Sequence, residues 1–305
     1  MTVPDGDGVA IAGVRLTSPD RVLFSELGLT KEALARFYDS VAEWILPDLK
    51  NRPLSLVRCP QGPEEGCFFQ KHIDNAWSGE IERASVPESD GVGIYAVANS
   101  PAALVGLVQK GVIELHVMGA ATRALDRPDR MVFDLDPGPG LAWRDVIAAA
   151  RLTRDVLDDA GLESFLKTSG GKGLHVVVPL APRHDWDEVK AFSRAVAEKL
   201  AGDDPHRFTA KMAKRERGER IFIDYLRNSP GATTVAAYSV RARKGAPVST
   251  PLHWDELGPR MKPGSYHAGN VARRLQGLHS DPWKTFRRKP QALTAAMKRK
   301  FGVSA

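Results

Sequence analysis

The sequence predicts an α+β fold built around a mixed β-sheet. Segments typical of strands and segments typical of helices follow one another without strict alternation, which favours a mixed-sheet α+β enzyme over a doubly wound one. The 305 residues suffice for one large domain or two small ones, and 43% apolar and 26% charged residues are ordinary for a globular protein. The N-terminal third is a candidate for a separate lobe, although no linker marks its boundary.

The elements of the first part of the chain follow from apolar spacing and from capping residues. A helix is predicted from Thr30, with its apolar residues on one face, and Pro47 is expected to stop it. The segment PLSLVRCP is typical of a strand. Residues 94–118 predict a strand, a helix and a strand, because Ser100 can cap the helix and Pro101 takes its first position.

Further strands and helices are predicted in the rest of the chain. RMVFDLD predicts a strand, Trp143 to Asp159 a helix, and SFLKTSGGKGLHVVVPL two strand halves around a glycine turn. Asp185 and Glu188 form a capping box that opens a helix through Leu200. IFIDYL and TVAAYSVRA predict two more strands, and the C-terminal residues from about 261 are expected to be helical and basic.

Net charge, apolar stretches and cysteine content indicate what kind of partner and which compartment to expect. The net charge is +6 and the isoelectric point is near 9.3, which weakly indicates a polyanionic partner. No apolar stretch approaches the length of a membrane span, and the N-terminus lacks the apolar core of a signal peptide. With only Cys59 and Cys67, we expect free thiols in a reducing cytoplasm, and these thiols with His72 would make a poor zinc site.

The segment VFDLDPGPG places two acids on a strand that then breaks. Side chains alternate along a strand, so Asp134 and Asp136 are expected on one face while Phe133 and Leu135 point into the core. Two carboxylates so close repel unless a cation lies between them, and Mg²⁺ and Mn²⁺ prefer such ligands. Pro137 ends the strand and opens this face to a large substrate. The alternative is a strand end with two solvated acids.

A third acid extends this pattern. Asp224 lies in IFIDYLRN, again embedded among apolar strand residues. Taken alone, Asp224 fits a strand end as well as a metal ligand. Three embedded aspartates from two strands would suffice to hold two divalent ions in the arrangement used for phosphoryl and nucleotidyl transfer.

The glycine turn in KTSGGKGLHVVVPL is a candidate anion site. Its three glycines permit backbone conformations that aim several N–H groups at one anion, and Ser169, Lys172 and His175 could add donors and charge. A P-loop is excluded, because Lys172 is followed by glycine and a strand follows where a helix should begin. The alternative is a hairpin turn with a solvated lysine.

Two other features point to nucleic acid. Basic residues cluster in KMAKRERGER, VRARKG, FRRK and MKRK, although such runs are more often solvated faces. Phe68 and Phe69 follow a loop rich in glycine, proline and glutamate, QGPEEGC. A pair of phenylalanines is usually part of a core, but on a loop it could stack against nucleobases.

Taken together, several segments resemble a known family. LTSPDRVLFSELGLTKEALARFY, CFFQKH, ELHVMGAATRALDRPDRMVFDLDPGPG, KTSGGKGLHVVVPL and IFIDYLRNSPGATTVAAYSVRARKGAPVSTPL are similar to the polymerase domain of bacterial DNA ligase D, in the archaeo-eukaryotic primase superfamily. The resemblance runs from about Leu16 to the end. It implies a primase-polymerase fold, α+β, with two packed mixed or antiparallel sheets flanked by helices and a metal site between them.

The resemblance also implies a division of one catalytic domain, 1–305, into portions. Residues from 1 to about 100 would bind the DNA end, those from about 101 to 260 would form the metal-binding palm, and 261–305 would form a basic helical portion. The activity implied is template-directed addition of ribo- or deoxyribonucleotides that fills gaps and extends ends in non-homologous end joining. The partners implied are DNA with gaps or 3′ overhangs, nucleoside triphosphates, an ATP-dependent DNA ligase and a Ku-type end-binding protein. We expect the protein in the bacterial cytoplasm, at the nucleoid.

Individual residues acquire roles from the same resemblance. The metal-binding acids, for two Mn²⁺ or Mg²⁺ ions, are Asp134, Asp136 and Asp224. The residues expected around the incoming nucleotide are His116, Ser169, Lys172, His175, Arg227 and Arg241. The DNA-binding residues are Phe68 and Phe69, which stack on the template side, and Arg21 and Lys31, which hold the 5′-phosphate of the downstream strand. The family often has Asn where this chain has Ser18, and Lys where it has Arg21; both changes keep hydrogen-bond donors, and the second keeps the charge.

Two other functions fit parts of the sequence. FDLD also begins phosphatases of the haloacid dehalogenase type, but there a Gly-Thr-Leu sequence follows and the motif lies near the start of the domain. A non-catalytic DNA-binding module would explain the basic runs and the phenylalanine pair. Without metals, however, three strand-embedded acids would repel DNA phosphates.

Overall fold

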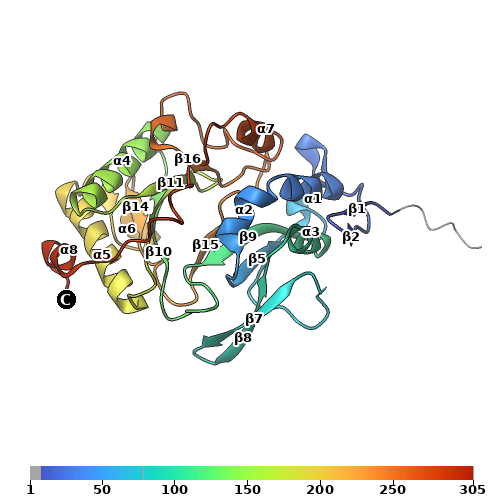
Figure 1. The fold of residues 1–305 in the computed structure, drawn as a ribbon. Coiled ribbons are helices and arrows are strands. Elements are labelled where there is room, and N and C mark those ends of the chain that lie inside the picture. Colours follow the sequence, from blue (N-terminus) through green and yellow to red (C-terminus); the bar gives the residue numbers. More distant parts are fainter. Residues whose placement is uncertain (1–7, 78, 305) are drawn as a thin grey trace, which may run out of the picture. The chain divides into compact units, whose positions relative to one another are not determined.

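The chain forms two compact units, each assembled from separate segments. The structure is a computed structural model that describes residues 8–77 and 79–304, and its elements are labelled in Figure 1. Unit 1 comprises the described part of Met1–Val117 with Val235–Val248 and His267–Gln276. Unit 2 comprises Met118–Thr234, Ser249–Tyr266 and the described part of Gly277–Ala305. The three portions expected along the chain stay a prediction.

Unit 2 is built on a six-stranded sheet. Its order is β13 (Phe208–Thr209), β14 (Ile221–Asp224), β10 (Arg130–Pro137), β12 (Leu174–Pro179), β11 (Phe165–Thr168) and β16 (Pro251–Leu252). All neighbours are antiparallel except β13 and β14, which are parallel. The glycine turn joins β11 directly to β12, and because the connection is short the two strands pair antiparallel.

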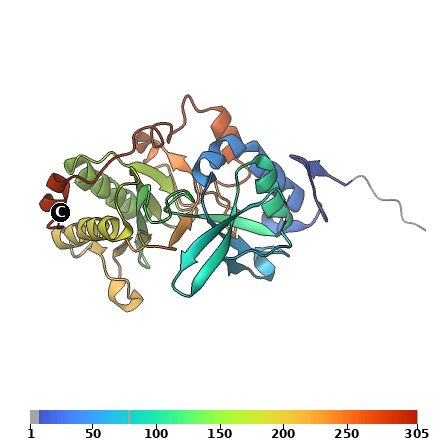
Figure 2. The same cartoon turned by 60° about the horizontal axis from the view of Figure 1, so that its bottom comes forward.

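Two long helices cover one face of this sheet. Helices α4 (Trp143–Asp159) and α5 (Trp186–Asp203) lie side by side, as Figure 1 and Figure 2 show. Phe133 and Leu135 of β10 are fully buried in the core that these helices share with the sheet. Side chains alternate along β10, so the acids between and after these residues belong to the opposite face. The predicted orientation of the VFDLD strand is confirmed.

Unit 1 contains a second six-stranded sheet. Its order is β15 (Thr233–Val235), β9 (Val112–Met118), β5 (Leu54–Arg58), β8 (Gly91–Val97) and β7 (Glu82–Glu88), and β6 (Phe68–Gln70) also pairs with β5. Its longer helices are α1 (Lys31–Ser40), α2 (Ala42–Leu49) and α3 (Pro101–Gln109). Two small hairpins, β1 (Ala10–Ile11) with β2 (Val14–Arg15) and β3 (Val22–Phe24) with β4 (Leu29–Thr30), precede them.

The remaining elements are short. They are the 3-10 turns η1 (Ser25–Leu27), η2 (Pro63–Glu65) and η3 (Trp254–Glu256), and the helices α6 (Lys214–Arg217), α7 (Val271–Gln276) and α8 (Ala295–Lys300). Among the described residues, no helix is both long enough and apolar enough to cross a bilayer.

Buried polar groups tie the segment after β15 to unit 1. The Tyr38 hydroxyl donates to the Ile113 carbonyl at 2.6 Å and accepts from the Val240 N–H at 3.1 Å. The Asp48 carboxylate accepts from the Ala237 N–H at 2.8 Å. A buried N–H without a partner is costly, so these contacts hold the backbone just before Arg241 in a defined place.

Most predicted elements are confirmed, with three differences. The first helix breaks at Val41, whose φ of −103° and ψ of 10° end α1, and Pro47 lies inside α2 instead of stopping it. TVAAYSVRA contributes only the short β15, because Tyr238 has a φ of +64° that no strand tolerates. The described residues of the C-terminal portion form only two six-residue helices. Between these helices, Trp283 is buried in turns and donates to the Leu166 carbonyl at 3.0 Å.

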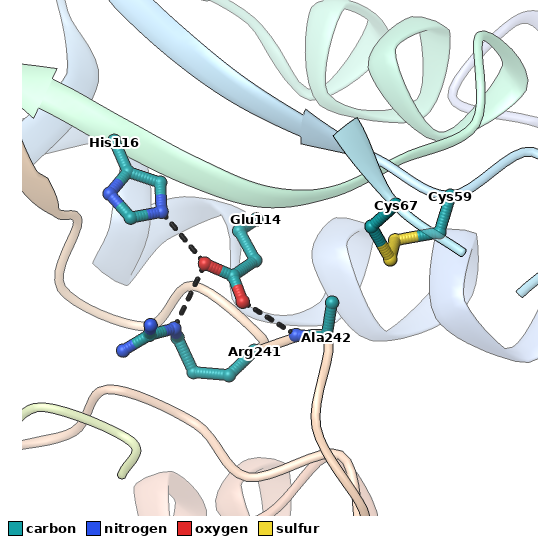
Figure 3. Close-up of a disulfide and its surroundings, with 6 residues drawn as sticks. All are labelled: Cys59, Cys67, Glu114, His116, Arg241 and Ala242. Atoms are coloured by element: carbon teal, nitrogen blue, oxygen red, sulfur yellow. Dashed lines mark hydrogen bonds and ion pairs between the residues drawn. A yellow bond between two sulfur atoms is a disulfide. The ribbon is translucent and has the colours of Figure 1, made fainter. Parts of the chain in front are cut away.

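The expectation of free thiols is wrong. Cys59 and Cys67 form a disulfide with their Cα atoms 4.3 Å apart, drawn in Figure 3. The reason is the antiparallel hairpin of β5 and β6, in which Arg58 pairs with Phe68. Cys59 follows Arg58 and Cys67 precedes Phe68, so the two cysteines face each other across the hairpin. Direct cross-strand partners approach this closely, and the disulfide closes the QGPEEGC loop.

Candidate active site

One transverse row of the unit 2 sheet carries four polar residues on four neighbouring strands. Lys167 of β11 pairs with His175 of β12, His175 pairs with Asp134 of β10, and Asp134 pairs with Asp224 of β14. Cross-strand partners point to the same face of a sheet. All four residues are buried. The fold therefore places a lysine, a histidine and two aspartates in one line.

Basic groups hold the two paired aspartates from both sides. His175 Nε2 lies 3.2 Å from Asp134 Oδ1. Arg227 Nε lies 3.0 Å from Asp224 Oδ2 and 3.7 Å from Asp134 Oδ2. At the end of the row, Lys167 Nζ donates to Ser249 Oγ at 2.8 Å. These contacts fix the carboxylates in place and limit their mutual repulsion.

The three aspartates differ in the pKa values of their carboxyl groups. Burial alone would raise the pKa of Asp134, but the charge and hydrogen bond of His175 and the charges of Arg227 and Lys167 lower it to about 2. Burial raises the pKa of Asp136 to about 6, and the charges of Asp134 and Asp224 add to this effect. Burial also raises the pKa of Asp224. Asp134 is thus the firmly ionised member, and Asp136 is the acid whose charge the surroundings favour least.

The donor set fits a hard divalent cation. Asp134, Asp136 and Asp224 each offer a carboxylate oxygen, and these oxygens lie within 4.8 Å of one another. Carboxylate oxygens are the ligands that Mg²⁺ and Mn²⁺ prefer. Burial and neighbouring negative charge disfavour the ionised form of Asp136. A cation bound at this place would therefore stabilise the negative charge of Asp136. Arg217 Nη1 is one nearby positive group, 3.9 Å from Asp136 Oδ2, and Arg227 is another.

The glycine turn is organised by Ser169. The N–H groups of Gly171 and Gly173 each donate to Ser169 Oγ at 3.2 Å, and Ser169 Oγ donates to the Gly173 carbonyl at 3.0 Å. Two N–H groups that we expected to face an anion are therefore used inside the turn. A Cβ at Gly173 would lie 2.5 Å from the Leu135 carbonyl oxygen, so this position needs glycine. Lys172 is exposed at the tip of the turn.

Unit 1 carries the two other residues expected near the nucleotide. His116 of β9 and Arg241 both contact the carboxylate of Glu114, as Figure 3 shows. His116 Nε2 lies 2.7 Å and Arg241 Nε 3.0 Å from Glu114 Oε2. Strand β9 and the segment after β15 thus bring together an imidazole and a guanidinium that are far apart in the sequence.

Phe68 and Phe69 lie on a strand, β6, and not on a loop. Their side chains are 48% and 53% exposed, so neither belongs to a core. Neighbouring residues of a strand point to opposite faces. Phe69 has an edge-to-face contact with His116, with ring centroids 6.0 Å apart, whereas Phe68 lies under the Arg58 guanidinium at 5.2 Å. Of the two phenylalanines, Phe69 is the one that shares a face with His116.

Arg21 and Lys31 are close neighbours. Lys31 is buried, and both burial and the charge of Arg21 lower its pKa. Lys31 Nζ donates to the Thr17 carbonyl at 2.9 Å, and Arg21 Nη1 donates to the Pro60 carbonyl at 2.8 Å. Two cations held this close by carbonyl groups form a place where an anion would be stabilised.

The backbone at the start of α1 does not contribute to this pair of cations. The N–H groups of Lys31, Glu32 and Ala33 donate to the Arg21 carbonyl, the Pro19 carbonyl and Thr30 Oγ1. These N–H groups therefore already have acceptors. Any phosphate here would depend on the two side chains.

Three residues of these clusters escaped sequence reasoning. Lys167 looked like an ordinary residue of a short strand, and its place in the row follows only from hairpin register. Arg217 stood in a basic run that resembles many solvated faces. Glu114 had a signal, because it lies two residues before His116 on one strand and therefore faces the same way.

Comparison with known proteins shows the family. Residues 30–283 match the family described as LigD, primase-polymerase domain. The chain is 44% identical over 294 residues to the multifunctional non-homologous end joining protein LigD of Pseudomonas aeruginosa, covering 96% of this chain and 35% of that protein. It is 35% identical over 253 residues to the LigD of Mycolicibacterium smegmatis, covering 80% and 32%. The chain thus spans about a third of the length of these relatives.

A solved structure supports the same assignment. The polymerase domain from Mycobacterium tuberculosis ligase D in complex with DNA superimposes with a TM-score of 0.85 at 30% identity, covering 91% of this chain and 99% of that one. The predicted α+β fold class and the resemblance inferred from the motifs are confirmed. The chain belongs to the LigD primase-polymerase domain family.

Proposed function

We propose that this chain is a template-directed nucleotidyltransferase that fills gaps and extends DNA ends during non-homologous end joining. The observation that carries the proposal is the cluster of Asp134, Asp136 and Asp224, whose carboxylate oxygens lie within 4.8 Å of one another. Membership in the LigD primase-polymerase family supports the same activity.

The three aspartates would hold two divalent ions, Mn²⁺ or Mg²⁺. When bound, such ions activate a 3′-hydroxyl and neutralise a leaving pyrophosphate. His175 and Arg227 keep the carboxylates of Asp134 and Asp224 oriented, so these ligands need little rearrangement on metal binding. Arg217, near Asp136, offers positive charge beside the acid that is hardest to ionise.

The nucleotide and DNA would use the other clusters. Lys172, at the exposed tip of the Ser169 turn, offers charge to a triphosphate, and His116 and Arg241 offer further donors. Phe69 and Phe68 would stack on template bases, and Arg21 and Lys31 would hold the 5′-phosphate of a downstream strand. The substrates proposed are gapped or 3′-overhanging DNA and ribo- or deoxyribonucleoside triphosphates.

The relatives suggest the setting. They are named as multifunctional end-joining proteins, so we propose that this chain acts with an ATP-dependent DNA ligase and a Ku-type end-binding protein at the bacterial nucleoid. The haloacid dehalogenase alternative needs an aspartate nucleophile open to attack, whereas Asp134 is buried between His175 and Arg227.

The test is nucleotide incorporation on a gapped DNA. Ribo- and deoxyribonucleotides are supplied separately, with Mn²⁺, with Mg²⁺ or with a chelator. We expect extension that requires the metal and the template and that is lost in Asp134→Ala, Asp136→Ala and Asp224→Ala. Template-independent release of phosphate from an aryl phosphate would instead support a phosphatase, and DNA binding with no incorporation would support a binding module.

A further inference from the structure

Glu114 is a buried carboxylate at the centre of a three-donor cluster in unit 1. It lies on β9 and is 5% exposed. Its Oε2 faces His116 Nε2 at 2.7 Å and Arg241 Nε at 3.0 Å, and its Oε1 accepts from the Ala242 N–H at 2.8 Å. Figure 3 shows the three contacts converging from two segments of the chain.

These contacts make the buried charge tolerable. Burial alone would raise the pKa of Glu114, but the hydrogen bond with His116, the charges of Arg241 and His116, and the Ala242 N–H lower it to about 2. Burial of a carboxylate without partners has a large free-energy cost, so the fold favours keeping these donors next to Glu114. The stabilisation is therefore mutual: the donors stabilise the charge of Glu114, and Glu114 orients the donors.

We infer that Glu114 is a positioning residue, which orients His116 and Arg241 toward the incoming nucleoside triphosphate. The inference rests on the proposed function and deepens it by naming what aligns two of the nucleotide-binding groups. Glu114 has no role of its own in contacting the nucleotide in this scheme, because both of its carboxylate oxygens are engaged by the protein.

The geometry defines which atoms the two partners can offer. An ionised Glu114 requires a proton on His116 Nε2, so a nucleotide would meet the Nδ1 edge of this ring. Arg241 faces Glu114 through Nε, and its two terminal nitrogens point away from the carboxylate in Figure 3. The ion pair at Nε orients the planar guanidinium, and a planar guanidinium suits bidentate binding of a phosphate.

The main chain is part of the same arrangement. The Arg241 N–H donates to the Pro247 carbonyl at 2.8 Å, and the next N–H, that of Ala242, donates to Glu114. Glu114 thus holds the side chain of residue 241 and the backbone that follows it. Loss of the carboxylate would remove this ion pair from the Arg241 side chain without removing the charge of Arg241.

A simpler role for Glu114 makes the opposite prediction. If Glu114 were only a counter-ion, its negative charge would weaken the attraction between Arg241 and a triphosphate. Removing that charge would then tighten nucleotide binding. The sign of the change therefore separates positioning from charge balance.

The experiment measures nucleotide binding and incorporation for Glu114→Gln and Glu114→Asp in the full chain. Glutamine has one acceptor oxygen, so its NH₂ must face at least one donor, and aspartate keeps the charge but is shorter by about 1.5 Å. We expect both variants to raise the KM for the nucleotide roughly 10- to 100-fold, with a smaller change in kcat. If Glu114→Gln is too unstable to assay, Glu114→Asp alone decides, because charge balance predicts no change for it.

Glu88→Gln is the matched control. Glu88, on β7 of the same sheet, pairs with His72 at 3.0 Å and accepts from the Tyr95 hydroxyl, so the substitution removes one charge and changes one histidine contact elsewhere in unit 1. We expect its KM for the nucleotide to equal that of the unmodified protein. An equal rise in KM in Glu88→Gln would overturn the inference, as would an unchanged or lowered KM in Glu114→Asp.

Double variants separate this inference from the proposed function. If Glu114 acts through its partners, Glu114→Gln should have little further effect in a His116→Ala, Arg241→Ala background, because coupled residues are not additive. A full additional rise in KM there would overturn the positioning role alone. No incorporation by the unmodified protein, or normal nucleotide binding by His116→Ala, Arg241→Ala, would overturn the proposed function at this site and the inference with it.

Discussion

Asp134 of β10 and Asp224 of β14 are direct cross-strand partners in an antiparallel pair. Like charges directly opposite each other destabilise a sheet. The fold offsets this repulsion with His175 on one side and Arg227 on the other. A sheet selected for stability alone would not place two aspartates here, so the pair indicates a function that needs them.

Asp224→Asn separates stability from function. The substitution keeps the shape and removes one of the two opposed charges, so we expect the metal-free protein to be as stable as the unmodified one or more stable. We also expect the rise in Tm caused by Mn²⁺ to disappear, together with nucleotide incorporation. Thermal unfolding with and without Mn²⁺ checks both. A retained Mn²⁺ effect would remove Asp224 from the ligand set.

Phe68 and Phe69 should differ in their effects. Phe69 shares a face with His116, so Phe69→Ala should weaken binding of the templated nucleotide by roughly 1 to 3 kcal/mol, the range for one stacked base. Phe68→Ala should act on DNA binding without raising the KM for the nucleotide. Both side chains are about half exposed, so we expect only small changes in Tm. Kinetics on a primer-template with each variant test this, and equal effects on KM would contradict the assignment of faces.

Arg21 and Lys31 should sense the downstream 5′-phosphate. Gap filling should be faster when the downstream strand ends in phosphate than in hydroxyl, and Arg21→Ala or Lys31→Met should erase that difference. The expected loss is about 1.5 to 3 kcal/mol of affinity for phosphorylated DNA, as for a charged hydrogen bond. Extension of a primer-template without a downstream strand is the control and should change little. Equal filling of both gapped substrates by the unmodified protein would remove this pocket.

Glu114 should make folding stability depend on pH in the acid range. Its pKa is lowered to about 2 from the ordinary 4.5, so its contribution is complete above about pH 4.5 and is lost as the pH falls toward 2. The free energy of unfolding should exceed that of Glu114→Gln by an amount on the order of 3 kcal/mol at pH 7. Urea unfolding at pH 7 and pH 3 measures the difference, which should shrink at the lower pH. A difference independent of pH would mean that the ionised carboxylate is not what stabilises the fold.

The disulfide should stabilise the hairpin that carries the phenylalanines. Closure of so short a loop is worth about 2 to 3 kcal/mol in the chain-entropy account. Cys67→Ser should lower the free energy of unfolding by this amount, and a reductant should lower that of the unmodified protein equally. The reductant should have no effect on Cys67→Ser. A further loss in reduced Cys67→Ser would show that the reductant acts elsewhere.

The sequence was sufficient for elements whose signals are local. Ser100 and the Asp185–Glu188 capping box lie where the helices begin, and alternation along β10 places Asp134 and Asp136 on one face. What the sequence did not show depends on register between distant strands. The Lys167–His175–Asp134–Asp224 row and the disulfide both arise from which residues face each other across a ladder, and neither follows from spacing in one segment.

Conformation set by packing was also beyond the sequence. Nothing in TVAAYSVRA signals the positive φ of Tyr238. The preceding Ala237 N–H is bound by Asp48, far away in the chain, and such long-range contacts decide where the strand ends. The C-terminal residues lose their expected helix for a similar reason, since burial of Trp283 against Leu166 favours turns.

The segmented make-up of the two units governs how such a protein can be divided or recombined. Among the described residues the chain passes between the units after Val117, Thr234, Val248, Tyr266 and Gln276. A gene fragment ending near Val117 would encode Glu114 and His116 without Arg241, and the Tyr38 hydroxyl would lose its bond to the Val240 N–H. Unit 1 can therefore not be excised whole with one cut. Exchange of unit 1 between relatives would therefore require all three of its stretches to be transferred together.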